Sequence, residues 1–266
     1  MSIRIAAAVV LLALSLPGQA FSAQGILLLA DEGTTEWQSR VTQLAQAVDK
    51  QKATELALWS ATNPNVQAAV DRLVQRGVSE IVAVPLFIAA LPPDFGARVK
   101  TSVPLRITAG LNDHPVAGEI VLDRAGEAST NSKTEVVVLV SHRSAAGNDQ
   151  RWVPDLGAAA RHLNQTRRFS MIITTTLPPT GADTPPEETA NLRRMVEREI
   201  ARQRRIIVVP VVTSYGGTEA AIEEQLRGLA HEVTTSALMP DDRLVDWIVS
   251  RVEAAPVAAD QPKPVR

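Results

Sequence analysis

Two stretches of this sequence carry the same succession of short, uninterrupted apolar runs, and this repetition constrains the fold more than any other feature. Residues 25–30 open the first stretch and residues 136–140 open the second. Apolar runs of this length, bounded by polar residues, are typical of parallel strands that are buried on both faces. The repetition therefore predicts two similar structural units.

The first unit alternates between strand and helix patterns. Strands are expected at residues 25–30, 55–59 and 81–87, and a helix with an apolar stripe is expected at residues 37–48. An Asn-Pro pair at residues 63 and 64 starts a second helix, and Gly77 ends it. Alternating strands and helices predict a parallel sheet covered by helices.

The second unit repeats this order. Strands are expected at residues 136–140, 169–176 and 206–212, and helices at residues 156–163, 184–200, 219–226 and 241–252. A Thr-Pro-Pro-Glu capping box at residues 184–187 starts the second of these helices. The fold class is therefore predicted to be α/β, with two tandem lobes that each contain a parallel sheet flanked by helices.

Composition shifts divide the chain further. Residues 1–22 combine an early positive charge, an apolar run and small residues, which is typical of a cleaved signal peptide. Lobes are expected at residues 23–123 and 135–253, joined by a polar linker at 124–134 and followed by a disordered tail at 254–266. We therefore expect a periplasmic or secreted protein. The alternative, an uncleaved anchor, is disfavoured because the run is too short for about 30 Å of hydrocarbon.

Charge and residue usage exclude several classes of function. A formal net charge of -2 gives no electrostatic reason to expect a nucleic-acid partner. The chain contains no cysteine, which excludes disulfides, thiol catalysis and thiolate metal sites. Any metal site in this chain must therefore use ligands other than thiolates.

The candidate functional residues follow the strands, because ligands of open parallel sheets bind beyond the carboxyl ends of the strands. His142 comes directly after an apolar run and one serine, where an imidazole can bind a metal or exchange a proton near neutral pH. The alternative is a loop histidine that hydrogen-bonds to the backbone. Arg143 and Ser144 follow it and are candidate substrate-binding residues.

Carboxylates occupy other strand ends. Asp31 and Glu32 follow the first strand and are candidate oxygen ligands for a hard cation; the alternative is a solvated turn or helix cap. Glu219 is a candidate metal ligand and catalytic partner of His142; the alternative is a first-turn glutamate that complements a helix dipole. The preceding segment supplies three more candidate substrate-binding residues: Tyr215, Gly216 and Gly217.

This pattern resembles the sirohydrochlorin cobalto- and ferrochelatases of the CbiX type. The resemblance covers residues 25–252 as two lobes, and the most specific stretches are GILLLADEGTTEW, GVSEIVAVPLFIAAL, VLVSHRSAAGNDQRW, RRIIVVPVVTSYGGTEAAIEEQLRGL and LMPDDRLVDWI. It implies two tandem chelatase-like lobes and insertion of Co²⁺ or Fe²⁺ into a tetrapyrrole, a lyase reaction of cobalamin or sirohaem biosynthesis.

The metal-binding histidines of that family are only partly present. In the family, one histidine follows the first strand and another follows the Val-Pro-Leu-Phe strand. Asp31 and Leu91 occupy these positions in the first lobe. In the second lobe His142 matches the first position and Gly216 occupies the other. Neither lobe keeps a histidine pair.

Three functions are therefore open. The first is a chelatase in which His142 binds the metal or accepts a proton and Glu219 assists. The second is an exported, non-catalytic protein that binds a tetrapyrrole or a metal and has lost the histidine pair. The third is an interaction module without a ligand. In the first two, a divalent metal is a substrate or ligand, and no tightly bound cofactor is expected.

Overall fold

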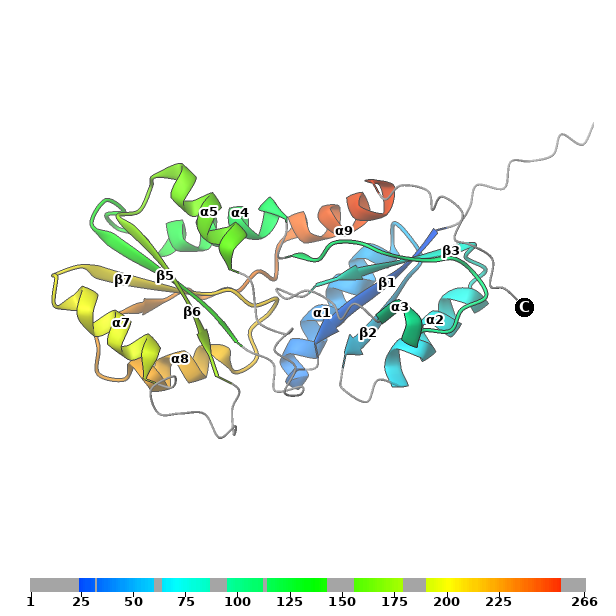
Figure 1. Ribbon diagram of the computed structural model, residues 1–266, viewed down its shortest axis with the longest axis horizontal. Coiled ribbons are helices and arrows are strands. Elements are labelled where there is room, and N and C mark those ends of the chain that lie inside the picture. The colour runs from blue at the N-terminus through cyan, green and yellow to red at the C-terminus, as the bar shows by residue number, and fades with distance from the viewer. Residues whose placement is uncertain are drawn as a thin grey trace, which may run out of the picture.

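The computed structural model describes residues 24–31, 33–59, 64–86, 95–111, 114–142, 156–178 and 190–254. Within them the chain forms two four-stranded sheets, with strand orders β2-β1-β3-β4 and β6-β5-β7-β8 (Figure 1). All neighbouring strands are parallel. The prediction of an α/β chain with two flanked parallel sheets is confirmed.

The elements of the first half follow the predicted order. They are β1 (Gln24–Asp31), α1 (Thr35–Asp49), β2 (Thr54–Trp59), α2 (Pro64–Gln75), β3 (Glu80–Pro85), α3 (Phe95–Arg98), β4 (Leu105–Ile107) and α4 (Pro115–Ala128). Gly77 follows α2 with a φ of +78°, a left-handed conformation that glycine adopts without a steric penalty. The sequence patterns did not predict α3, β4 or α4.

The second half repeats the arrangement. Its elements are β5 (Glu135–His142), α5 (Gly157–Thr166), β6 (Met171–Leu177), α7 (Asn191–Ile200), β7 (Arg205–Pro210), α8 (Thr218–Leu226), β8 (Glu232–Val233) and α9 (Asp242–Ala254). The short strand β8 was not predicted. The predicted capping box at 184–187, the signal peptide and the tail from residue 255 onward lie outside the described residues. None of the described helices has both the length and the apolar composition to cross a membrane.

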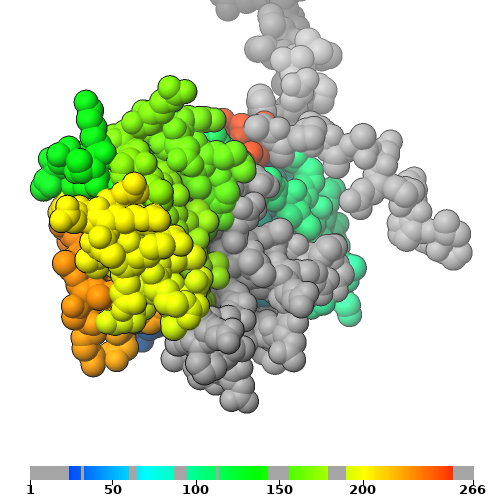
Figure 2. Space-filling model, turned by 60° about the vertical axis from the view of Figure 1, so that its left-hand side comes forward, coloured from blue at the N-terminus to red at the C-terminus, as the bar shows by residue number. Residues whose placement is uncertain are grey.

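Strand alternation distributes the core over both faces of each sheet. In β1, Ile26 and Leu28 point into one cluster of buried side chains, whereas Leu27 and Leu29 point into another. The first cluster continues into the second lobe through residues of β5 and β7, so one apolar core spans both lobes. On the opposite face of the second sheet, α7 and α8 lie side by side (Figure 2), and Arg193 donates to the carbonyl oxygens of Gln225 and Arg227 at 3.1 and 3.0 Å.

Two helices cross between the lobes. Helix α4 follows the first sheet in sequence but packs against α5 and β7, and α9 follows the second sheet but packs against α1 and β3 (Figure 1). The predicted linker at 124–134 is corrected accordingly: residues 124–128 form the last turns of α4. Neither lobe is therefore a continuous stretch of sequence.

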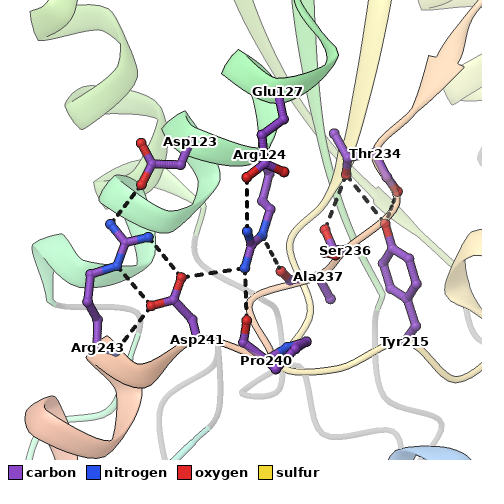
Figure 3. A network of polar contacts seen from close by, with 10 residues as sticks. All are labelled: Asp123, Arg124, Glu127, Tyr215, Thr234, Ser236, Ala237, Pro240, Asp241 and Arg243. Atoms are coloured by element: carbon purple, nitrogen blue, oxygen red, sulfur yellow. Dashed lines mark hydrogen bonds and ion pairs between the residues drawn. The ribbon is translucent and has the colours of Figure 1, made fainter.

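Arg124 of α4 anchors the segment that leads from the second lobe to α9. Its guanidinium donates to the carbonyl oxygens of Ala237 and Pro240 at 3.2 and 3.0 Å, just before α9 begins (Figure 3). Asp241 lies between Arg124 and Arg243, with nearest N–O distances of 3.4 and 2.8 Å. The side chains of Arg124 and Asp241 are 13% and 11% exposed, so water screens these contacts little. The network fixes where the chain passes from the second lobe to the first.

Candidate functional site

The carboxyl ends of the two sheets meet at the boundary between the lobes. In each sheet the strand order reverses beside the first strand, between β1 and β3 and between β5 and β7, which is where open parallel sheets bind ligands. Thr213, which follows β7, donates its hydroxyl to the carbonyl oxygen of Leu86, which follows β3, at 2.9 Å. Thr213 is buried, so this bond is shielded from water. Both switch points therefore border the same interlobe region.

His142 is the last residue of β5 and lies at this edge. The strand pairs with β6 in a register that sets His142 opposite Leu177, and the preceding Ser141 is buried. Burial lowers the pKa of the partly exposed His142 imidazole below its ordinary value of 6.5. No described residue forms a hydrogen bond with the ring. At pH 7 the side chain is therefore a neutral imidazole with an available nitrogen lone pair.

Glu219 lies in the first turn of α8 and contacts the backbone there. Its carboxylate accepts hydrogen bonds from the backbone N–H groups of Gly216 and Gly217 at 3.3 and 3.2 Å, at the start of α8. This contact satisfies otherwise unpaired N–H groups and places negative charge at the positive end of the helix dipole. Within the described residues, no hydrogen bond or ion pair joins Glu219 to His142. The geometry favours the helix-capping interpretation of Glu219.

Tyr215 lies in the loop after β7 and contacts another segment of its own lobe. Its hydroxyl donates to the carbonyl oxygen of Thr234, and the Thr234 hydroxyl lies 3.4 Å from the same phenol oxygen (Figure 3). Burial is the main reason why the pKa of Tyr215 is raised above its ordinary value. The phenol is therefore neutral at physiological pH and ties the loop after β7 to the segment after β8.

Three of the predicted site residues, and the side chain of a fourth, lie outside the described residues. Asp31 is the last residue of β1 and pairs with Trp59 of β2, but its side chain is outside the described set. Glu32 and the neighbours Arg143 and Ser144 lie outside the described residues. Among the residues that the structure does describe, no group of three histidine, aspartate or glutamate side chains could hold a metal ion.

Gly216 makes an interlobe contact that the sequence did not reveal. A Cβ atom at this position would lie 3.0 Å from Thr34 Oγ1 and 3.0 Å from Trp37 Cβ in the first lobe. Thr34 caps α1 by accepting a hydrogen bond from the Trp37 backbone N–H at 3.3 Å. The only available signal was the Thr-Thr-Glu-Trp start of α1, which indicates a capped helix and says nothing about its distant neighbour.

A larger side chain at this contact should separate the lobes. Replacing Gly216 by valine is expected to lower the free energy of unfolding by about 1–3 kcal/mol, because the added atoms overlap with Thr34 and Trp37. Urea unfolding followed by tryptophan fluorescence measures this loss. Gly96→Val is the matched control, since a Cβ there meets only Ile107 at 3.6 Å, an ordinary contact. Equal stability of the two variants would contradict the close interlobe approach.

Comparison with known proteins supports the chelatase resemblance. Residues 27–128 match the model of the CbiX family. SirB from Bacillus subtilis with Fe³⁺ superposes with a TM-score of 0.65 at 15% identity, over 86% of this chain and 94% of that one. The structure of CbiX, described as the terminal enzyme for siroheme biosynthesis in denitrifying bacteria, gives 0.59 at 15% identity, over 87% and 99%.

A third structure shares the arrangement within a larger protein. A multi-domain protein from Deinococcus radiodurans with structural similarity to chelatases gives a TM-score of 0.56 at 16% identity, over 86% of this chain and 55% of that one. Comparison with curated protein sequences finds no match. The resemblance to CbiX-type sirohydrochlorin chelatases is therefore confirmed in two respects: residues 27–128 match the family model, and the two-lobed fold is shared with the solved structures.

Proposed function

We propose that this relative of the CbiX-type chelatases binds a tetrapyrrole that already carries its metal, and that His142 supplies a ligand to that metal. The observation that carries the proposal is the neutral, partly buried imidazole at the end of β5, beside the strand-order reversal of the second sheet. A neutral imidazole is the form of histidine that binds iron and cobalt ions. One such nitrogen would supply a protein ligand to the metal of a metallated macrocycle.

Binding is favoured over metal insertion by the chemistry that the described residues offer. Insertion requires an ion held at the site and a base that accepts the pyrrole protons. Glu219, the carboxylate considered for this task, is hydrogen-bonded to the start of α8. A carboxylate beside His142 would raise the pKa of the imidazole, whereas burial leaves it lowered. His142 therefore acts without a charged partner among the described residues.

The solved relatives support a metal-bearing ligand, and the N-terminal sequence supports a location outside the cytoplasm. The solved relatives include SirB with Fe³⁺ and SirB in complex with cobalt, so their fold accommodates these metals. In this chain, residues 1–22 have the pattern of a signal peptide. We therefore propose a periplasmic or secreted binding protein, which would encounter finished metallated tetrapyrroles rather than biosynthetic intermediates of the cytoplasm.

The test is an absorbance titration of the purified protein with haem and with cobalt-loaded sirohydrochlorin. Saturable binding is expected, and His142→Ala should weaken it at least about tenfold, because the metal loses its protein ligand. His231→Ala is the matched control. That imidazole contacts the carbonyl oxygen of Leu229 at 2.9 Å and Glu223 at 3.3 Å, and the residue belongs to the turn before β8. Its removal should leave the affinity unchanged.

The same titration has a defined pH dependence. Protonation of His142 competes with metal ligation, and because the pKa of the imidazole is lowered, this competition sets in at a lower pH than for an ordinary histidine. Affinity should therefore be independent of pH well above the lowered pKa and fall as the pH drops through it. Conversion of metal-free sirohydrochlorin by added Co²⁺, faster with protein and lost in His142→Ala, would instead establish a chelatase and contradict the proposal.

A further inference from the structure

Two unpaired nitrogen donors lie together on α9. Trp247 and Arg251 are one helical turn apart, and the Arg251 guanidinium carbon lies 5.7 Å from the centroid of the Trp247 ring. Trp247 is only 3% exposed, yet among the described residues its indole Nε1 has no hydrogen-bond partner, and neither has the buried Nε of Arg251. Buried N–H groups are almost always paired in folded proteins, so two adjacent exceptions require an explanation.

A third donor comes from the start of α4. His114 caps this helix, its Nδ1 accepting a hydrogen bond from the Val116 backbone N–H at 3.2 Å. When the ring is neutral, its proton is therefore on Nε2, which is left as a donor. The His114 and Trp247 ring centroids are 6.1 Å apart. Donors from two helices thus gather where α4 and α9 meet.

The Arg251 guanidinium brings a positive charge to this junction. Within the described part of the chain, no aspartate or glutamate forms an ion pair with Arg251. Burial lowers the pKa of His114, the nearby charge of Arg251 lowers it further, and the charge of Glu119 offsets this in part. The start of α4, a helix of 14 residues, adds the positive end of its dipole. The unpaired donors and the positive charge therefore both favour a negatively charged ligand that accepts hydrogen bonds.

We propose that the junction of α4 and α9 binds a small oxyanion, a carboxylate or phosphate group, through Trp247 Nε1, the Arg251 guanidinium and His114 Nε2. A guanidinium forms paired hydrogen bonds with the oxygens of either group. The indole and imidazole N–H groups supply further donors and no competing acceptor. The anion would hold α9 of the first lobe against α4, which packs on the second sheet. Anion binding here does not depend on tetrapyrrole binding at His142.

The test follows the Trp247 indole N–H by ¹H–¹⁵N NMR of the whole protein, with Trp247→Phe identifying the resonance. Sodium acetate and sodium phosphate are titrated separately, against sodium chloride at the same ionic strength. A saturable shift with acetate, phosphate or both, and none with chloride, is expected. The oxyanion that saturates at the lower concentration distinguishes a carboxylate site from a phosphate site.

Substitutions assign the shift to the proposed donors. Arg251→Gln should raise the saturating concentration at least about tenfold, because the charge and the paired donors are lost. His114→Asn keeps a helix-capping side chain and should weaken binding less. Arg227→Gln is the matched control, since that side chain is 75% exposed. Equal shifts with chloride, no shift with either oxyanion, or undiminished binding in a folded Arg251→Gln protein would overturn the proposal.

Discussion

Ending the chain after Asp241 is expected to unfold the N-terminal lobe, although the deleted helix lies at the opposite end of the sequence. Helix α9 packs against α1 and β3 and buries four large side chains that are at most 3% exposed: Leu244, Trp247, Ile248 and Val252. Their burial contributes about 6–12 kcal/mol. This is comparable with the entire stability of a typical domain, about 5–15 kcal/mol.

Thermal unfolding followed by tryptophan fluorescence measures this effect, because Trp37 and Trp59 both lie in the first lobe. The truncated chain should lose its cooperative transition or melt far below the intact protein. A chain that ends after Ala254 keeps α9 and is the matched control, and its transition should be unchanged. If removing α9 left the transition in place, its packing against α1 and β3 would contribute little to the fold.

The long apolar strands were predictable because their burial is recorded in consecutive residues. In β1 and β5, every residue from Ile26 to Ala30 and from Val136 to Val140 is at most 1% exposed. A strand covered on both faces needs apolar side chains in both directions, so its sequence is a continuous apolar run. Each sheet is centred on such strands, and their repetition therefore predicted two sheets.

The helix exchange was not predictable from local patterns. An apolar stripe indicates that a helix packs against something, but it does not identify the sheet that receives it. The stretch from residue 124 to 134 is rich in polar residues, which favoured a linker. Arg124 is polar for another reason, since its guanidinium binds the carbonyl oxygens of Ala237 and Pro240 more than 100 positions later. Contacts over such separations leave no periodic signal.

In the candidate site, too, one feature was predictable from the sequence and another was not. The place of His142 followed from topology, because a residue that ends a central parallel strand must lie at the ligand-binding edge. The role of Glu219 did not follow, because a carboxylate in a first helical turn can face a ligand or cap its own helix. Only the hydrogen bonds to Gly216 and Gly217 distinguish these alternatives.

Replacing Glu135 by alanine is expected to lower the free energy of unfolding by about 3–5 kcal/mol, because several donors lose one buried, charged acceptor. The side chain is 1% exposed and bonds to Arg205 at 2.6 Å. It also accepts hydrogen bonds from the Ser129 hydroxyl and from the backbone N–H groups of Thr130 and Asn131. Alanine removes the acceptor that Ser129, Thr130 and Asn131 share, while Arg205 keeps its contacts with the Ala128 carbonyl oxygen and with Glu232. The turn between α4 and β5 therefore loses its anchor.

Urea unfolding measures this cost, with Glu224→Ala as the control. The Glu224 carboxylate is 65% exposed, and within the described part of the chain it pairs only with Arg227, so its removal should cost about 1 kcal/mol or less. Glu135→Gln should fall between the two, since it keeps one acceptor oxygen and the shape of the side chain. A Glu135→Ala protein as stable as the Glu224→Ala protein would contradict the anchoring role.

Lowering the pH should remove the stability that the Glu135 carboxylate contributes. Burial alone would raise the pKa of Glu135, but the hydrogen bonds from Ser129, Asn131, Thr130 and Arg205 outweigh it and lower the pKa from 4.5 to about 2. The stability that this carboxylate contributes is therefore fully present above pH 4.5 and is lost as the pH falls to about 2, a change of roughly 3 kcal/mol. Glu135→Gln has no proton to bind at this position. The difference in stability between wild type and Glu135→Gln, measured by urea unfolding at each pH, should therefore shrink across that interval.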